Sequence, residues 1–205
     1  MRPTELLMHE HQVIERVLGC LEKMADLAEA QQPLDPTLAE QAVDFFRSYA
    51  DRWHHGKEEE LLFPMMESKG FSRANGPTGV MLHEHDQGRR LVGAMADAIA
   101  GLPAESAAFV ENARGYVRLL REHINKENHC LFPMADQALS EAEQKELAAS
   151  IDRVQREVLD PGTEEKYVAI AQQLADKLGV QQTPSPAGVP GGCHAAGGEA
   201  APGAP

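Results

Sequence analysis

The sequence predicts an all-α protein built around an antiparallel four-helix bundle with up-down-up-down connections. Four long segments carry apolar residues at helical spacing, and no useful length of chain alternates apolar and polar residues as a strand would. Links rich in Pro, Gly and Asp separate the four segments. Because short links between long helices favour antiparallel neighbours, a simple bundle is the expected architecture.

The first two helices follow from local signals at their ends. The first begins near Pro3 and continues to about Gln31, where the stretch QPLDP breaks it. Asp35 is an expected N-cap with Pro36 in the first turn of the second helix, which continues to about Lys69. Proline late in a helix removes a hydrogen bond and clashes with the preceding turn, so we expect a kink at Pro64 in the second helix and at Pro133 in the fourth.

The third and fourth helices are delimited in the same way. The loop SRANGPTG precedes the third helix, which is expected to end at Gly101. The stretch LPAES leads into the fourth, which is expected to end near Leu139. Residues 1–139 therefore form the expected bundle domain.

Two further segments follow the bundle. Residues 140–180 are expected to add two short helices on its outside, one opened by a capping box of Ser140 and Glu143 and one capped by Thr163. Residues 181–205 are rich in Pro, Gly and Ala and predict a disordered tail. We interpret the adjacent Cys193 and His194 in that tail as an incidental pair.

Composition excludes several classes of partner. The 205 residues include 19 Lys and Arg against 32 Asp and Glu, a formal net charge of -13, which disfavours nucleic acid and anionic membranes. We find no signal peptide pattern and no apolar run long enough to cross a membrane. Cys20, Cys130 and Cys193 are scattered and suggest no disulfide framework, so a reducing, cytoplasmic location is expected.

The two halves of the predicted bundle repeat. LMHEHQVIERVLG from Leu7 aligns with MLHEHDQGRRLVG from Met81, and HHGKEEELLFP from His54 aligns with HINKENHCLFP from His123. Eight of the nine histidines lie in these four stretches. The repeated unit is therefore a helical hairpin that carries histidines and glutamates on both of its helices.

Six residues of these stretches are candidate metal ligands. His54 with Glu58, and His123 with Glu127, are four residues apart, so each pair lies on one face of its helix. Apolar residues at helical intervals share that face, so it is also the core face. With antiparallel neighbours the histidines of the first and third helices reach the same level. The predicted ligands are His11, His54, Glu58, His85, His123 and Glu127.

The other histidines are assigned elsewhere. His9 and His83 lie on the opposite face from His11 and His85, which share a face with apolar residues. His55 and His129 are expected to point away from the ligands, toward solvent or the periphery of the site. Glu15 makes a third His-xxx-Glu spacing with His11, and we expect it to be a peripheral carboxylate.

The ordered set of ligands closely resembles the hemerythrin-like, HHE cation-binding domains over roughly residues 4–138. The resemblance implies a non-haem di-iron centre with the four histidines as terminal ligands and the two glutamates as bridges. Mn or Zn could occupy a His/Glu site of this kind. The oxygen-carrying members resemble this chain less, because Arg89 and Glu127 stand where they place a histidine and an aspartate. Ferritin-like sites, with Glu-x-x-His, fit more poorly.

Three hypotheses about function follow from the resemblance. The first is a cytoplasmic di-iron protein that senses or scavenges O2, NO or peroxide, and the second is an oxidoreductase that consumes hydrogen peroxide or nitric oxide. Tyr116, seven residues before His123, could donate a hydrogen bond or an electron there, although a role as a core aromatic is also open. The third is an iron buffer or a module that binds an unknown protein partner. On two six-coordinate irons, four histidines, two bridging glutamates and one bridging oxide or hydroxide would leave one open position on each metal. That arrangement favours redox reaction over reversible carriage.

Overall fold

The computed structural model describes residues 1–157 and 162–181, and most of these residues are helical. Within these residues no strand is present, which confirms the all-α prediction. The four rods of the bundle comprise α1 (Pro3–Glu29); α2 (Pro36–Phe45) with η1 (Phe46–His55), η2 (Glu58–Leu62) and α3 (Phe63–Ser68); α4 (Pro77–Ala100); and α5 (Ser106–Lys126) with η3 (Glu127–Leu131) and α6 (Phe132–Ala138).

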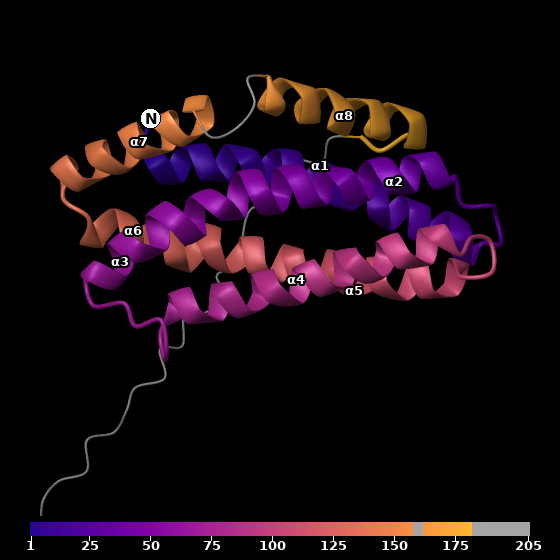
Figure 1. Cartoon of the computed structure of the whole chain (residues 1–205), viewed down its shortest axis with the longest axis horizontal. Helices are drawn as coiled ribbons and strands as arrows, with labels where there is room; N and C mark the ends of the chain where they lie inside the picture. Colours follow the sequence, from indigo (N-terminus) through magenta and orange to yellow (C-terminus); the bar gives the residue numbers. More distant parts are fainter. Residues whose placement is uncertain (158–161, 182–205) are drawn as a thin grey trace, which may run out of the picture.

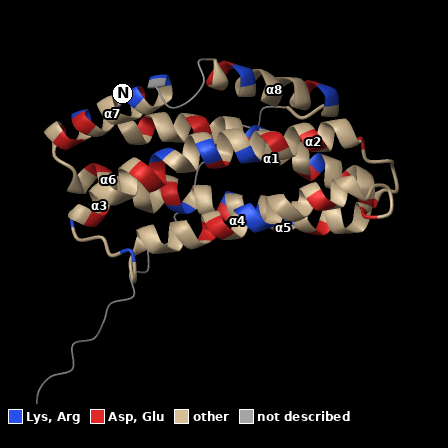
Figure 2. Ribbon diagram, viewed as in Figure 1, with Lys and Arg blue, Asp and Glu red and all other residues tan. Residues whose placement is uncertain are grey.

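The rods lie side by side, and successive rods are joined at opposite ends (Figure 1). The helix ends agree with the local signals: Asp35 accepts hydrogen bonds from the backbone N–H groups of Thr37 and Leu38 at the start of α2. Acidic and basic residues are interspersed along the helices rather than gathered in separate ones (Figure 2). The up-down-up-down bundle predicted from the link lengths is the observed arrangement.

The second and fourth rods contain π-helical segments, which the 3.6-residue periodicity did not predict. Both η2 and η3 end two residues before a proline, Pro64 or Pro133. Each also begins at a predicted ligand, Glu58 or Glu127. A π-helix bonds residue i to i+5, so the local widening accommodates a residue that lacks an N–H group. The repeat therefore extends to the backbone, with a π segment between ligand and proline in both halves.

A buried polar layer separates two apolar clusters along the bundle. Leu7 and Leu62 belong to one cluster, whereas Ile14 and Trp53 belong to the other. The same order holds in the second half of the bundle, where Leu131 and Leu120 lie on opposite sides of the layer. Burial of both clusters fixes the registration of the four rods, because each apolar residue moved to water costs roughly 1.5–3 kcal/mol.

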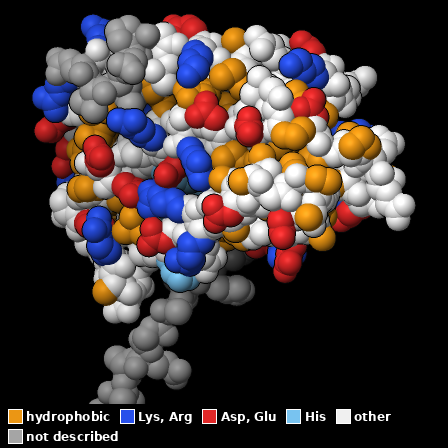
Figure 3. Space-filling view, turned by 45° about the vertical axis from the view of Figure 1, so that its right-hand side comes forward, with side chains coloured by type: hydrophobic (Ala, Val, Ile, Leu, Met, Phe, Trp, Pro, Cys, Tyr) orange, Lys and Arg blue, Asp and Glu red, His pale blue; other side chains and the backbone are white. Residues whose placement is uncertain are grey.

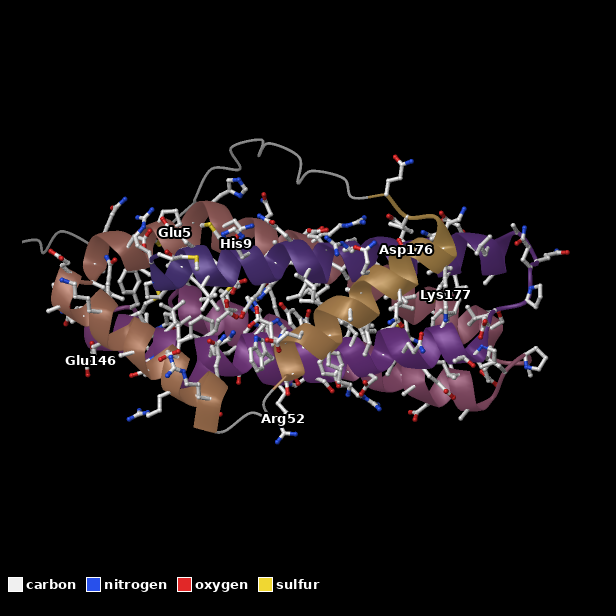
Figure 4. The ribbon with its side chains drawn as sticks, turned by 90° about the horizontal axis from the view of Figure 1, so that it is seen from above. Glu5, His9, Arg52, Glu146, Asp176 and Lys177 are labelled. Atoms are coloured by element: carbon white, nitrogen blue, oxygen red, sulfur yellow. The ribbon has the colours of Figure 1, made fainter. Side chains whose placement is uncertain are left out.

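Two helices cover the bundle from outside, as expected. α7 (Glu141–Glu157) packs on α1 and η2, and α8 (Thr163–Leu178) packs on α1 and α2. In the view from above, α8 crosses the bundle obliquely, with Asp176 and Lys177 near its end (Figure 4). Ser140 and Glu143 form the predicted capping box. At α8 the N-cap is Gly162 rather than Thr163, because the helix begins one residue earlier than its sequence signal suggests.

The remaining expectations have mixed outcomes. Cys20 is free and buried, but Cys130 is disulfide-bonded, so the expectation that the cysteines form no disulfide is wrong for Cys130. The predicted tail, with Cys193 and His194, lies outside the described residues apart from its first residue. Across residues 1–157 and 162–181, no helix has both the length and the apolar character needed to span a bilayer.

Candidate metal centre

The six predicted ligands meet in the polar layer at the centre of the bundle. Each of them is at most 2% exposed. The second histidine of each HEH motif points inward, as predicted, whereas His9 and His83 are exposed; His9 lies on the outer side of α1 (Figure 4). All six come from four different rods, so tertiary packing rather than local sequence brings them together.

The inner atoms of the six residues face one another. Glu127 Oε2 lies 3.2 Å from both His11 Nε2 and His123 Nε2. Glu58 lies 3.5 Å from His54 Nε2 through Oε1 and 3.6 Å from His85 Nε2 through Oε2. A metal bound at about 2.1 Å by nitrogen or oxygen places neighbouring ligand atoms roughly 3 Å apart. The observed spacings are therefore close to those of ligands that share a metal.

The outer nitrogen of each ligand histidine donates one further hydrogen bond, always to a side-chain oxygen on another rod. These pairs, with Nδ1 to oxygen distances, are His11 with Asn128 at 2.8 Å, His54 with Glu10 at 2.8 Å, His85 with Glu59 at 2.7 Å, and His123 with Glu84 at 2.9 Å. A carboxylate can only accept, so Nδ1 of its partner carries the proton and Nε2 presents a lone pair inward.

Sequence reasoning missed these four partners, although the repeat contained the signal. Glu10 and Glu84 are the middle residues of the two HEH motifs, and Glu59 and Asn128 each follow a predicted glutamate ligand. An alternating His-Glu-His places its glutamate on a different helix face from the ligand. That face meets the neighbouring rod, so the glutamate reaches a histidine on that rod instead of the metal.

Lysines complete the outer network in both halves. Lys57 contacts Glu10, and Lys126 contacts Glu84. The Glu10 pair is buried, and Trp53 also donates to Glu10 at 3.0 Å, whereas Lys126 is 39% exposed. Burial raises the pKa of Glu10 and lowers that of Lys57, and their mutual attraction opposes both shifts. In each half, a lysine and a glutamate therefore hold one ligand histidine in place. The pair that holds His54 is buried, and the pair that holds His123 is partly exposed to solvent.

Burial and mutual charge shift the pKa values of the ligands themselves. Burial and the charge of Glu127 raise the pKa of Glu58, whereas the imidazoles of His123 and His11 overcome burial and lower the pKa of Glu127. Although burial lowers the pKa of His123, Glu127 and Glu84 raise it to about 9. In the absence of metal, a proton on His123 thus compensates the charge of Glu127.

The expectation that His55 points away from the ligands is wrong. It is 5% exposed, and its ring stacks on that of His85 with centroids 3.8 Å apart. Trp53, His54 and His55 are all buried in η1, where a π-helix has more residues per turn and a smaller angle between successive side chains. Burial, with the charge of His85, lowers the pKa of His55 to about 3.

The other peripheral assignments hold. His129 is exposed and its ring bonds to the backbone oxygen of Asn125. Glu15 lies 3.4 Å from Arg121 in a half-exposed ion pair. Arg89, which stands where oxygen carriers place a histidine, bonds to Asp51 at 2.9 Å and to Glu59 at 2.6 Å. It therefore links the carboxylates that contact His55 and His85.

A cavity of about 190 Å³ reaches the centre from the side of α4 and η1. The ligand His85, with His55 beside it, forms one part of its wall, and the rings of Tyr116 and Phe46 form another. Gly88 leaves the space open, because a Cβ there would lie 3.3 Å from the Tyr116 ring. On the face seen in Figure 3, acidic and basic side chains lie close together and are interspersed with apolar ones. The cavity admits only a small molecule.

The inward-facing atoms fit a pair of metal ions. Among the described residues, none gives a hydrogen bond to either carboxylate oxygen of Glu58 or Glu127, or to Nε2 of His11 or His54. The Nε2 atoms of His85 and His123 lie 3.1 Å apart, a distance at which they can share one proton when no metal is bound. Buried atoms without partners are costly. Cations between them would satisfy every such atom, and two groups of potential ligands share Glu58.

The fold and this centre define a class: helical-bundle proteins that bind metal through a buried set of histidines and carboxylates. The particular family follows from comparison with known proteins. Residues 2–135 match the hemerythrin family, described as the Hemerythrin HHE cation binding domain, and the chain belongs to that family. The resemblance noted from the sequence is thereby confirmed.

Relatives within this family show where the likeness ends. An uncharacterized protein of Mycobacterium tuberculosis is 28% identical over 157 residues, which cover 72% of this chain and 59% of the relative. The iron-sulfur cluster repair protein YtfE of Pectobacterium carotovorum is 32% identical over 133 residues, covering 62% and 59%. The chain thus spans about three fifths of the length of these relatives. No solved structure matches it significantly.

Proposed function

We propose that the protein binds two iron ions between its six buried ligands and uses them to sense or scavenge a small oxidant or diatomic molecule. The observation that carries this proposal is that the two ring nitrogens of each ligand histidine have different surroundings. Nδ1 is hydrogen-bonded to an outer oxygen, whereas Nε2 faces carboxylate oxygens that have no hydrogen-bond partner. Histidine and carboxylate ligands also suit Mn or Zn. The name of the YtfE relatives, which refers to iron, favours iron here.

Iron bound at this centre would supply electron transfer to a small ligand such as O2, NO or peroxide. The protein controls the approach of that ligand. The cavity beside His85 is too small for an organic substrate of ordinary size, and the buried apolar clusters above and below the polar layer exclude bulk water. The outer oxygens hold the imidazole rings in place, which keeps the ligand set preorganised.

A second candidate function is an oxidoreductase that consumes hydrogen peroxide or nitric oxide. Tyr116 supports it, since its buried ring lines the cavity together with His85 and borders Gly88. Burial raises the pKa of Tyr116, so its hydroxyl stays protonated and can donate a hydrogen bond toward the cavity. A net charge of -13 also supports our proposal that the partners are small molecules rather than nucleic acid or anionic membranes. We propose that the protein acts in the cytoplasm.

The test uses iron-loaded, reduced protein mixed separately with air, hydrogen peroxide and nitric oxide. We expect oxidation by air within minutes that is not reversed when oxygen is removed. Turnover of many equivalents of peroxide or nitric oxide per protein would support the oxidoreductase, whereas a single stoichiometric reaction would support a sensor. An oxygenated spectrum that forms and reverses over many cycles would contradict both functions and indicate a carrier.

A further inference from the structure

The cavity beside His85 has a buried interior and a charged entrance. Most of the residues that line it are buried, and the rings of Phe46 and Tyr116 are at most 2% exposed. The lining residues that reach the surface are all charged and form the cavity entrance: Arg47, Asp51 and Arg89. A molecule that moves from solvent to His85 through the cavity must therefore pass between these side chains.

Arg89 extends across the cavity entrance and is held there by three carboxylates. Its Nε donates to Asp51 of η1 at 2.9 Å, its Nη2 to Glu59 of η2 at 2.6 Å, and its Nη1 to Asp86 of α4 at 3.0 Å. A planar guanidinium can bond several carboxylates at once in a fixed geometry, whereas a lysine ammonium is a compact point charge. Arg89 therefore connects α4 to η1 and η2 at the point where the cavity opens.

The repeat shows that the arginine and the cavity occur together. The positions aligned with Gly88, Asp51 and His55 hold buried apolar residues in the other half: Ile14, Leu120 and Ile124. The position aligned with Arg89 holds Glu15, which lies 3.4 Å from Arg121 in a half-exposed ion pair. Apolar side chains thus fill the space in one half, and the arginine is present only in the half that has the opening.

A role in stability alone would not require an arginine at an opening. Arg114 is a comparable residue, since it bonds Asp26 at 2.6 Å and Glu29 at 2.7 Å, is 33% exposed and does not line the cavity. The side chain of Arg89 is 38% exposed. Exposed ion pairs are individually weak, so the guanidinium can leave Asp51 for short times. A small molecule can then pass beside the closed pair, whereas a larger one has to wait until the pair opens.

We propose that Arg89 determines by size which molecules enter the cavity. Closed on Asp51, it admits a molecule as small as hydrogen peroxide and excludes an organic hydroperoxide such as tert-butyl hydroperoxide. The inference rests on the proposed function for the identity of the entering molecule, but the barrier itself requires no metal. Because Arg89 also bonds Glu59, which holds His85, its variants are compared first in the metal-free protein.

The first experiment measures access to the cavity in the metal-free full chain. Val92→Cys places a thiol on the cavity wall, and peptide mass locates the label after reaction with methyl methanethiosulfonate or its bulkier benzyl analogue. We expect Arg89→Ala to speed the benzyl reagent by about tenfold or more and the methyl reagent by less than about threefold. Arg114→Ala is the matched control and should change neither rate.

Three results of this experiment would overturn the proposal: an unchanged benzyl rate in Arg89→Ala, equal acceleration of both reagents, or the same effect in Arg114→Ala. Arg89→Lys keeps the charge but bonds fewer carboxylates, so the benzyl reagent should react at an intermediate rate. If Arg89→Ala fails to fold, this second variant decides, and a benzyl rate equal to that of the native arginine would contradict the role of Arg89.

The second experiment separates this inference from the proposed function. Iron-loaded, reduced protein with Val92 intact is mixed with hydrogen peroxide or tert-butyl hydroperoxide, and the rates are compared per bound iron. We expect the native chain to prefer hydrogen peroxide and Arg89→Ala to reduce that preference by about tenfold. An unchanged preference would overturn the role of Arg89. A native chain that reacts with neither peroxide would contradict the proposed function, and thiol labelling would still decide the role of Arg89.

Discussion

The two halves of the bundle hold the same ligands in the same way but surround them differently. Glu10 with Lys57 and Glu84 with Lys126 occupy aligned positions, and each pair supports the inward histidine of a neighbouring rod. Beside them, however, one half has Gly88, Asp51 and His55 where the other has three buried apolar residues. The repeated positions build the centre, and the positions that differ open it on one side.

The largest expected effect on metal content comes from replacing the two inward-facing glutamates, one in each half of the bundle. Glu58→Ala and Glu127→Ala should each lose both metals, because each carboxylate faces histidines on two rods. Metal content after purification with iron supplied measures this, with His129→Ala as control. Retention of both metals in either glutamate variant would show that these carboxylates are not ligands.

A second comparison concerns the two outer carboxylates. Glu10→Gln should destabilise the metal-free protein by about 3 kcal/mol, because it leaves the buried Lys57 without its counter-ion. Glu84→Gln should cost about 1 kcal/mol or less, since Lys126 is partly exposed. Urea unfolding of the metal-free variants measures both. Equal losses would mean that burial does not distinguish the two halves.

The pH dependence of metal binding follows from the raised pKa values of Glu58 and His123. Metal binding requires both groups without their protons, so uptake should release protons and the affinity should rise with pH up to about 9. Titration in buffers of different protonation enthalpy measures the release. An affinity that does not change between pH 6 and 9 would contradict the assignment of these ligands.

The same shift predicts opposite trends in stability. The pKa of His123 is raised in the folded protein, so its contribution to stability is present below the unfolded value of 6.5 and is lost as the pH rises through about 9. The metal-free protein should therefore lose stability over this interval, whereas the metal-loaded protein should not. Urea unfolding at both ends of the interval, with and without metal, provides the comparison.

The smallest expected effect concerns the cavity. Gly88→Ala introduces a Cβ that lies 3.3 Å from the Tyr116 ring and narrows the approach to His85. We expect unchanged metal content and a reaction with peroxide slower by roughly twofold to tenfold, because only access changes. Stopped-flow oxidation of the reduced protein measures it. Gly93→Ala, where a Cβ meets no neighbour, is the matched control.

Most of the fold and the inner ligands could be predicted from the sequence. Helical periodicity, the cap at Asp35 and the aligned repeat were sufficient for the four rods, and shared core faces selected His11 and His85 over their neighbours. The position of His55 could not be predicted, because adjacent residues of an α-helix point in different directions and His54 was assigned to the core face. Only the π-helical backbone of η1 brings both side chains inward.

The outer partners of the histidines depend on contacts between rods, which periodicity does not give. Glu10 and Glu84 were visible as the middle residues of HEH, but their histidines lie on other rods, 44 and 39 residues away in the chain. The cavity likewise depends on the meeting of Gly88 and Tyr116 across two helices. Such features follow from packing, after the rods have been brought into register.

The central claim, a dinuclear iron centre within the bundle, is tested most directly by crystals of protein produced with iron supplied. Anomalous diffraction at the iron edge should give two peaks per chain, one beside His11 and His54 and one beside His85 and His123, with Glu58 and Glu127 between them. A single peak, peaks elsewhere in the chain, or no iron at these ligands would contradict the account.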